Sequence, residues 1–182
     1  MNLGWTDGDP DGVLMPIKNS IKLVPWDSKV LQVLISMRKE QEKWGVIENP
    51  AEVDPRNILE KVMNKFKGTG LNPVVAFELE FYLLDKKRNK EGKPVPALGA
   101  SKTHVYGIPD LDMFGDLFNE INENCKIQDI PATTASSEFA AGQYEINLKH
   151  TSDLLKAADD AAMLRRIIKE TTAKHGFEAT FM

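Results

Sequence analysis

Residues Pro73 to Asp85 read PVVAFELEFYLLD, an almost unbroken run of strand-forming residues that follows the helix-ending Gly70. Side chains alternate along a strand, so Glu78 and Glu80 share one face while Phe81 lies on the other. The neighbours of the two acids on their face are apolar or aromatic, which suits a cavity better than open solvent. The stretch therefore predicts a strand that presents a pair of carboxylates to a cavity.

A second carboxylate pair, Glu138 and Glu145, lies in the stretch SSEFAAGQYEINL at residues 136–148. We interpret this stretch as a hairpin with Ala141–Gly142 as its two-residue turn, because Gly142 readily adopts the positive φ that such turns need. That turn predicts that Glu138 lies directly opposite Glu145. Like charges so placed, with Cβ atoms roughly 5 Å apart, destabilise a sheet. A raised pKa, a bound cation or exposure to water would relieve the repulsion.

The four acids support two interpretations. Glutamates that alternate along a strand commonly form no more than a solvated face. The sharper hypothesis is a divalent-cation site built from hard oxygen ligands, and its candidate ligands are Glu78, Glu80, Glu138 and Glu145. A cation-binding module of an unrelated fold also remains open.

Composition bounds the class of protein. A chain of 182 residues can bury a core, and its net charge of −4 argues against a nucleic-acid partner. The sequence contains no apolar stretch of the roughly 20 residues that a membrane helix needs, so we expect no membrane partner. The start of the chain lacks signal-peptide features, and the single cysteine, Cys125, excludes an internal disulfide. We expect a cytoplasmic protein in which Cys125 is a structural thiol.

Periodicity places the remaining elements. Residues 30–37 predict one strand buried on both faces. Asp54 and Pro55 predict the start of a helix, whose apolar stripe from Ile58 to Phe66 is expected to pack in the core. A second helix is expected from about Asp112. A third should begin near residues 150–153 and end at Gly176, before a strand.

Several motifs resemble those of the glutamine synthetase family. Residues 76–83 resemble its E-x-E-F strand, and residues 138–145 resemble its E-x-x-x-G-Q-x-E hairpin. Residues 175–182 are similar to the stretch that leads to its K-P motif. Gly4-Trp5 and residues 13–16 resemble the end of its β-grasp domain. The four segments occur in the family's order along essentially the whole chain.

The resemblance implies an α+β fold: part of a glutamine synthetase-like catalytic domain, an antiparallel sheet or half-barrel with flanking helices. It implies two domains, a β-grasp remnant at 1–26 and the first part of the catalytic domain at 27–182. Glu80, Glu138 and Glu145 match the ligands of one Mg²⁺ or Mn²⁺ ion, and Glu78 matches a ligand of a second ion. At the position of a nucleotide-contacting glutamate in some relatives this chain has Thr133, so no ATP-contacting or catalytic residue is assigned.

The implied activity is the ATP-dependent ligation of an amine to the γ-carboxylate of glutamate through a γ-glutamyl phosphate. The substrates would be glutamate, ATP and an amine, and the full-length enzyme would be a homo-oligomer. Residues 54–56, 76–85 and 144–150 are more similar to the γ-glutamylpolyamine branch than to ammonia-using enzymes. The chain resembles a fragment truncated at both ends, expected to be inactive alone. The alternative is a non-catalytic remnant or assembly subunit that keeps the fold without turnover.

Overall fold

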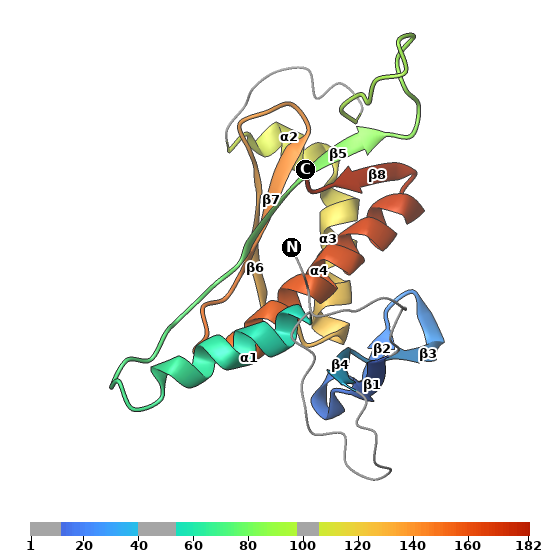
Figure 1. Cartoon of the computed structure of the whole chain (residues 1–182). Coiled ribbons are helices and arrows are strands. Elements are labelled where there is room, and N and C mark those ends of the chain that lie inside the picture. The colour runs from blue at the N-terminus through green and yellow to red at the C-terminus, as the bar shows by residue number, and fades with distance from the viewer. Residues whose placement is uncertain (1–11, 40–53, 98–105) are drawn as a thin grey trace. The chain divides into compact units, whose positions relative to one another are not determined.

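The computed structural model describes residues 12–39, 54–97 and 106–182 (Figure 1), and the chain divides into two compact units. The first unit comprises Met1–Val74 with Ser152–Leu155, and the second comprises Val75–Thr151 with Lys156–Met182. The domain boundary predicted between residues 26 and 27 falls where strand β3 begins; that division itself stays a prediction. Gly4-Trp5 lies outside the described residues.

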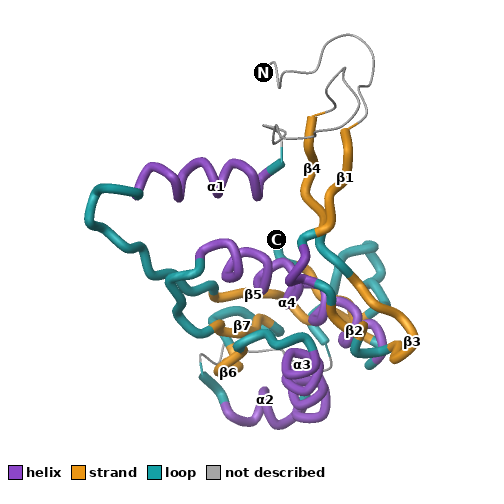
Figure 2. Tube along the Cα trace, turned by 90° about the horizontal axis from the view of Figure 1, so that it is seen from below, coloured by secondary structure: helices purple, strands orange, loops and turns teal. Residues whose placement is uncertain are grey.

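In its described residues, the first unit contains two small antiparallel sheets and the helix α1 (Figure 2). Its elements are β1 (Gly12–Pro16), a 3₁₀ turn (Lys18–Ser20), β2 (Lys22–Val24), β3 (Asp27–Gln32), β4 (Ile35–Lys39) and α1 (Pro55–Phe66). Strand β1 pairs with β4, and β2 pairs with β3.

The single strand predicted at residues 30–37 is wrong, because the chain breaks between β3 and β4. The amide of Leu34 donates to Ser20 Oγ at 2.8 Å, and its carbonyl accepts from the amide of Ile17 at 2.8 Å. Leu34 is thus bonded to the 3₁₀ turn, and the chain passes from one partner strand to another. Burial on both faces is also wrong, since Leu31 is 66% exposed and Ile35 is 51% exposed.

Helix α1 begins and ends as predicted. The Asp54 side chain accepts a hydrogen bond from the amide of Arg56 at 2.9 Å, and Gly68, with φ of +83°, follows the last turn. The apolar stripe does not pack in a core as expected, because Ile58 and Val62 are 47% and 41% exposed.

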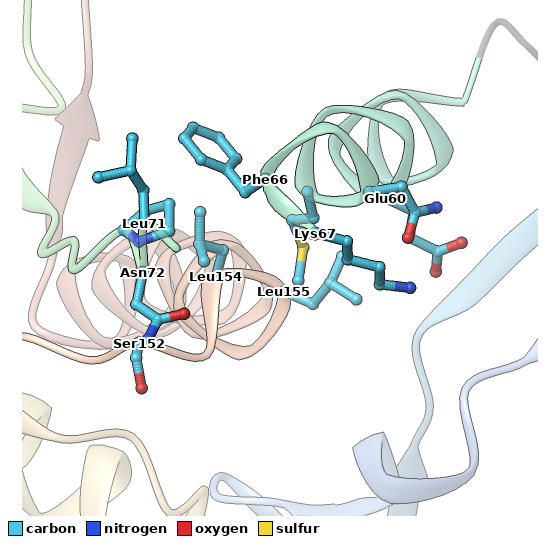
Figure 3. Close-up of a pocket in the computed structure, with 11 residues that line it drawn as sticks. Glu60, Phe66, Lys67, Leu71, Asn72, Ser152, Leu154 and Leu155 are labelled. Atoms are coloured by element: carbon cyan, nitrogen blue, oxygen red, sulfur yellow. The ribbon is translucent and has the colours of Figure 1, made fainter. Parts of the chain in front are cut away.

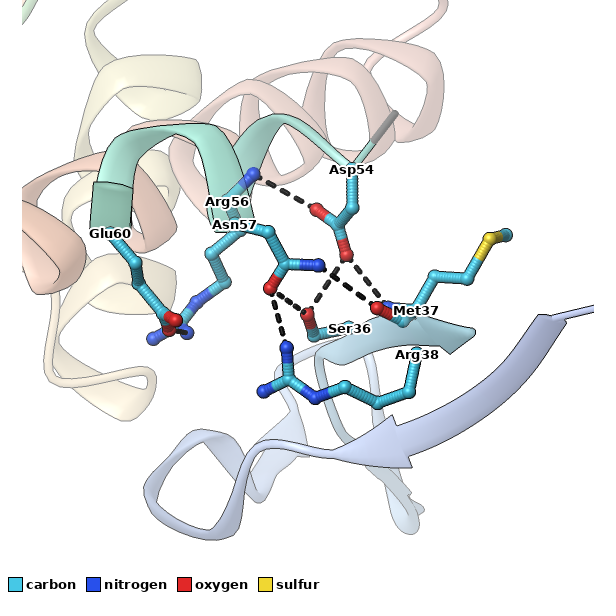
Figure 4. A network of polar contacts seen from close by, with 7 residues as sticks. All are labelled: Ser36, Met37, Arg38, Asp54, Arg56, Asn57 and Glu60. Atoms are coloured by element: carbon cyan, nitrogen blue, oxygen red, sulfur yellow. Dashed lines mark hydrogen bonds and ion pairs between the residues drawn. The ribbon is translucent and has the colours of Figure 1, made fainter. Parts of the chain in front are cut away.

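A polar network joins the start of α1 to β4 (Figure 4). Asp54 Oδ2 accepts from Ser36 Oγ at 2.9 Å and from the amide of Met37 at 2.7 Å. Asn57, the buried residue of α1, donates to the carbonyl of Met37 at 2.9 Å and accepts from Arg38 at 2.6 Å. The buried polar groups of Ser36 and Asn57 thereby find partners, and these hydrogen bonds join α1 to β4.

The second unit is an antiparallel sheet with helices. Its elements are β5 (Glu78–Asp85), α2 (Ile108–Met113), α3 (Gly115–Ile127), β6 (Ala132–Ser137), β7 (Gln143–Leu148), α4 (Leu154–Lys174, from Lys156 onward) and β8 (Phe177–Thr180). The strand order is β6-β7-β5-β8, with every pairing antiparallel (Figure 1).

One face of this sheet is apolar and buried. Phe81 and Leu83 on β5 are 1% and 0% exposed, as the alternation of the sequence predicts. The ring of Tyr144 on β7 lies 5.1 Å from the ring of Phe118 on α3, between centroids, and 6.2 Å from that of Phe81. The helices therefore bury this face, and the opposite face carries the acids.

The helix expected from about Asp112 is interrupted. Phe114, with φ of −114° and ψ of 24°, separates α2 from α3. This non-helical residue buries its ring edge-on against the rings of Tyr144 and Phe177, with centroid distances of 5.8 and 5.5 Å. The packing of the Phe114 ring thus accompanies a break between α2 and α3 at this position.

The last helix and strand follow the prediction. Helix α4 ends at Lys174, and Gly176, with φ of +88°, leads into β8. Cys125 lies inside α3, where burial raises the pKa of its thiol to about 12. No helix among the described residues is long and apolar enough to cross a membrane.

Candidate metal centre

The register between β5 and β7 brings acids face to face. Glu80 lies directly opposite Glu145, and Glu78 lies opposite Asn147. All four side chains belong to the sheet face turned away from Phe81 and Tyr144, because alternate residues of a strand share a face. The first predicted pair and one acid of the second therefore share one patch of the sheet. The cavity predicted for the first pair is wrong, because Glu78 and Glu80 are exposed to solvent.

The hairpin between β6 and β7 differs from the prediction in its register. Gly142, with φ of +72°, closes the expected turn, since the amide of Gln143 donates to the carbonyl of Ala140 at 2.9 Å. However, the amide of Glu138 also donates to the carbonyl of Gln143, at 2.8 Å. The first arm of the loop therefore carries two additional residues, and Ser136, not Glu138, lies opposite Glu145. Because the offset is two residues, Glu138 keeps the same face as Glu145.

Three uncharged side chains on the acidic face each donate to one carboxylate. Gln143 Nε2 donates to Glu80 Oε2 at 2.9 Å. Asn147 Nδ2 donates to Glu145 Oε1 at 2.8 Å. Ser136 Oγ donates to Glu138 Oε1 at 3.1 Å. These bonds restrict the carboxylate rotamers without neutralising the charge, as the outer shell of a metal site commonly does.

At Glu145, burial and the charges of neighbouring carboxylates act in the same direction. Partial burial raises the pKa of Glu145, and the carboxylates of Glu138, Glu78 and Glu80 raise it further, against the opposing effect of the hydrogen bond from Asn147. A carboxyl whose charged form is disfavoured by neighbouring carboxylates would be relieved by a bound cation.

In the part of the chain that the structure describes, no three acidic, histidine or cysteine side chains are close enough to enclose a metal ion. The structure thus brings the four predicted acids onto one face without closing a coordination sphere. The donor set is nevertheless suited to a hard divalent cation, because it consists of carboxylate and amide oxygens. One of these oxygens, Asn147 Oδ1, is buried and accepts no hydrogen bond from the described residues.

The three donors Ser136, Gln143 and Asn147 were not predicted from the sequence. Their signal was present, because Gln143 and Asn147 each stand two residues from Glu145 on the same strand and so share its face. Thr133 lies on β6, and its hydroxyl donates to the carbonyl of Asn147 at 3.2 Å.

A pocket of about 640 Å³ lies in the first unit (Figure 3). Its lining comes from the second half of α1, the following loop and the first turn of α4, and includes Phe66, Leu71 and Leu154. The charged side chains in its lining are Glu60 and Lys67. It contains none of the predicted site residues.

An antiparallel sheet with a carboxylate face, and helices on its other face, is the arrangement that the resemblance to the glutamine synthetase catalytic domain implies. Residues 52–182 match the family model of the glutamine synthetase catalytic domain. The chain belongs to the glutamine synthetase family of glutamate–amine ligases.

Two curated relatives are similar over nearly the whole chain. The γ-glutamylputrescine synthetase PuuA of Escherichia coli (strain K12) is 39% identical over 187 residues, which cover 99% of this chain and 38% of the relative. The glutamate–isopropylamine ligase of a Pseudomonas species is 35% identical over 186 residues, which cover 98% of this chain and 38% of the relative. The chain therefore spans well under half the length of these relatives.

A solved structure described as a GmaS/ADP complex has the same fold, with a TM-score of 0.83 and 24% sequence identity. The match covers 99% of this chain and 39% of that one. The α+β architecture inferred from the sequence, part of a glutamine synthetase-like catalytic domain, is confirmed.

Proposed function

We propose that this chain provides the carboxylate face of the cation site in an ATP-dependent glutamate–amine ligase. The observation that carries the proposal is the pairing of Glu80 with Glu145 on neighbouring strands, with Glu78 and Glu138 near enough to raise the pKa of Glu145. Glu80, Glu138 and Glu145 would hold one Mg²⁺ or Mn²⁺ ion, and Glu78 would contribute to a second.

When bound, the cations would neutralise charge on the phosphate oxygens during phosphoryl transfer from ATP to the γ-carboxylate of glutamate. The residues of this chain contribute position. Three of the carboxylates stand on the paired strands β5 and β7, a rigid support, and Glu138 directly follows β6. Gln143, Asn147 and Ser136 donate to Glu80, Glu145 and Glu138. Preorganisation of this kind lowers the cost of assembling charge around a reacting phosphate.

The acceptor would be an alkyl amine, with a polyamine such as putrescine as the first candidate and ammonia as the second. This assignment is supported by the names of the two relatives, a γ-glutamylputrescine synthetase and a glutamate–isopropylamine ligase. A homo-oligomer and a cytoplasmic location stay predictions drawn from the family resemblance and the sequence.

Cation binding tests the proposal directly. We expect Mn²⁺ to raise the thermal midpoint of the chain, by about 2.7 kcal/mol of stability at a hundredfold excess over Kd, and Glu138→Gln or Glu80→Gln to remove most of that gain. Glu123→Gln is the matched control, because Glu123 lies on α3 in an exposed ion pair with Lys126. A midpoint that millimolar Mn²⁺ leaves unchanged would count against the proposal.

A further inference from the structure

Asn147 occupies a distinctive position on the acidic face. It lies on β7 two residues after Glu145 and directly opposite Glu78 on β5. Its Nδ2 donates to Glu145 Oε1 at 2.8 Å and to Thr134 Oγ1 at 3.3 Å. Its Oδ1 is buried and, among the described residues, has no hydrogen-bond donor.

The orientation of this amide follows from its surroundings. An amide turned the other way would place its oxygen against the carboxylate of Glu145, where two acceptors repel. The nitrogen therefore faces Glu145, and the oxygen is the atom that has no hydrogen-bond partner among the described residues. A buried carbonyl oxygen without a donor is costly, and native proteins almost always provide such a group with a partner.

A hard divalent cation is a chemically suitable partner. Side-chain amide oxygens belong to the usual ligands of such ions, together with carboxylates and water. Glu78 is the residue directly opposite Asn147, and Glu145, on the same face, accepts from its Nδ2 at 2.8 Å. A cation attracted to these two acids would come near the amide of Asn147.

We propose that Asn147 completes the cation site of this face, with Nδ2 orienting Glu145 and Oδ1 serving as a neutral oxygen ligand of the ion. The inference rests on the proposed function, because it assumes that the acids bind a cation. It goes further because it assigns a role to a residue outside the carboxylate set. The affinity of the site for the cation then depends on an uncharged side chain.

Mn²⁺ titration of the full chain, followed by electron paramagnetic resonance of the free ion, tests the role of Asn147. Asn147→Leu removes both polar atoms at similar volume and is expected to raise the Kd for Mn²⁺ by about 10–100-fold. Asn147→Asp restores an oxygen ligand but cannot donate to Glu145. It should bind Mn²⁺ at least as tightly as the wild type, while its thermal midpoint without the ion falls because a further negative charge joins the face.

Thr134→Val is the matched control. It removes the other acceptor of Nδ2 but leaves Oδ1 and the bond to Glu145, so its Kd should stay within about twofold of the wild-type value. A purely structural Asn147 would lower the thermal midpoint of both Asn147 variants without changing the Kd of Asn147→Leu, and that result would overturn the inference. A Thr134→Val variant that loses affinity as strongly as Asn147→Leu would also overturn it.

The outcomes separate this inference from the proposed function. If Glu80→Gln and Glu145→Gln abolish Mn²⁺ binding and Asn147→Leu does not, the cation site stands and the role of Asn147 fails. If none of these variants alters binding, the proposed function fails first. Should Asn147→Leu not fold, Asn147→Asp decides, because weaker Mn²⁺ binding by that variant contradicts an oxygen ligand at this position.

Discussion

Glu80 on β5 and Glu145 on β7 face each other across two hydrogen-bonded strands, in the same register row of the sheet. Each carboxylate accepts a hydrogen bond from an uncharged neighbour, Gln143 for Glu80 and Asn147 for Glu145. The sheet therefore holds two like charges in a fixed pair. Two like charges so placed cost stability, and a bound cation would relieve that cost.

The first prediction concerns the pH dependence of this pair. Burial and the nearby carboxylates raise the pKa of Glu145, so the folded state holds its proton more tightly than the unfolded state. The associated stability is fully present below the unfolded pKa and is lost as the pH rises through the folded pKa. Without metal, Glu145→Gln should be more stable than the wild type at neutral pH by about 0.2–1 kcal/mol, and the difference should shrink in acid.

Urea unfolding at a series of pH values, with and without Mn²⁺, measures this effect. Added Mn²⁺ should reverse the order, making the wild type more stable than the variant at neutral pH. If the wild type and Glu145→Gln have the same free energy of unfolding at every pH, with and without Mn²⁺, the two carboxylates neither repel each other measurably nor bind the ion.

A second prediction concerns Glu120 on α3. It accepts from Lys174 Nζ at 2.6 Å and contacts His175 Nε2 at 2.8 Å. The hydrogen bond from Lys174, aided by that from His175, lowers the pKa of Glu120 against the opposing effect of burial. The resulting stability is present above the unfolded pKa and is lost as the pH falls through the folded pKa.

Glu120→Gln should therefore cost up to about 1 kcal/mol at neutral pH, and the cost should vanish in acid. Chemical denaturation at both ends of this pH range measures it. Glu123→Gln, with its exposed partner Lys126, should change little at either pH. A cost for Glu120→Gln that persists in acid would mean that packing, not charge, is responsible.

The third prediction concerns Gly142 in the β6–β7 hairpin. Its φ of +72° disfavours other residues, and a Cβ atom there would lie 2.9 Å from the carbonyl oxygen of Leu83 and 3.1 Å from Cβ of Pro96. Gly142→Ala thus combines backbone strain with a steric clash, and it should cost more than about 1–3 kcal/mol of stability. Gly68 has a φ of +83°, but a Cβ atom there would meet no atom within 4 Å, so Gly68→Ala isolates the backbone cost.

Thermal unfolding of the two alanine variants measures the difference between them. Gly142→Ala should also weaken Mn²⁺ binding, because the turn sets the position of Glu138. Equal losses of stability for the two variants would show that the loop relaxes around the added methyl group.

The fourth prediction concerns Asp54 at the start of α1. It caps the helix through the amide of Arg56 and accepts from Ser36 and Met37 on β4. Asp54→Ala should cost about 1–3 kcal/mol, because it removes a cap and leaves an amide without its acceptor. Hydrogen exchange of the Met37 amide should accelerate in parallel.

Asp27→Ala is the control for that variant, since Asp27 accepts a single exposed bond from the amide of Lys29 at 3.0 Å. It should change stability by less than about 0.5 kcal/mol. If the Met37 amide exchanges no faster in Asp54→Ala than in the wild type, the hydrogen bonds of Asn57 are sufficient to hold α1 on β4.

Local features could be predicted from the sequence because their causes are local. The alternation of β5 follows from the period of a strand, the cap at Asp54 from a carboxylate that reaches its own helix, and the positive φ of Gly142 from the absence of a side chain. The same alternation places Glu78 and Glu80 on one face. These properties require no distant partner.

The tertiary structure decided what depends on partners far along the chain. Leu34 lies between β3 and β4, outside both strands, because its amide bonds to Ser20 in the 3₁₀ turn. Phe114 separates two helices, and its ring packs against those of Tyr144 and Phe177. The hairpin register set Ser136 opposite Glu145, since strand pairing fixes an offset that the turn residues alone leave open. The acidic face survived that offset because a shift of two residues preserves the face of a strand, whereas the opposition of Glu80 and Glu145 arose only when β5 and β7 paired.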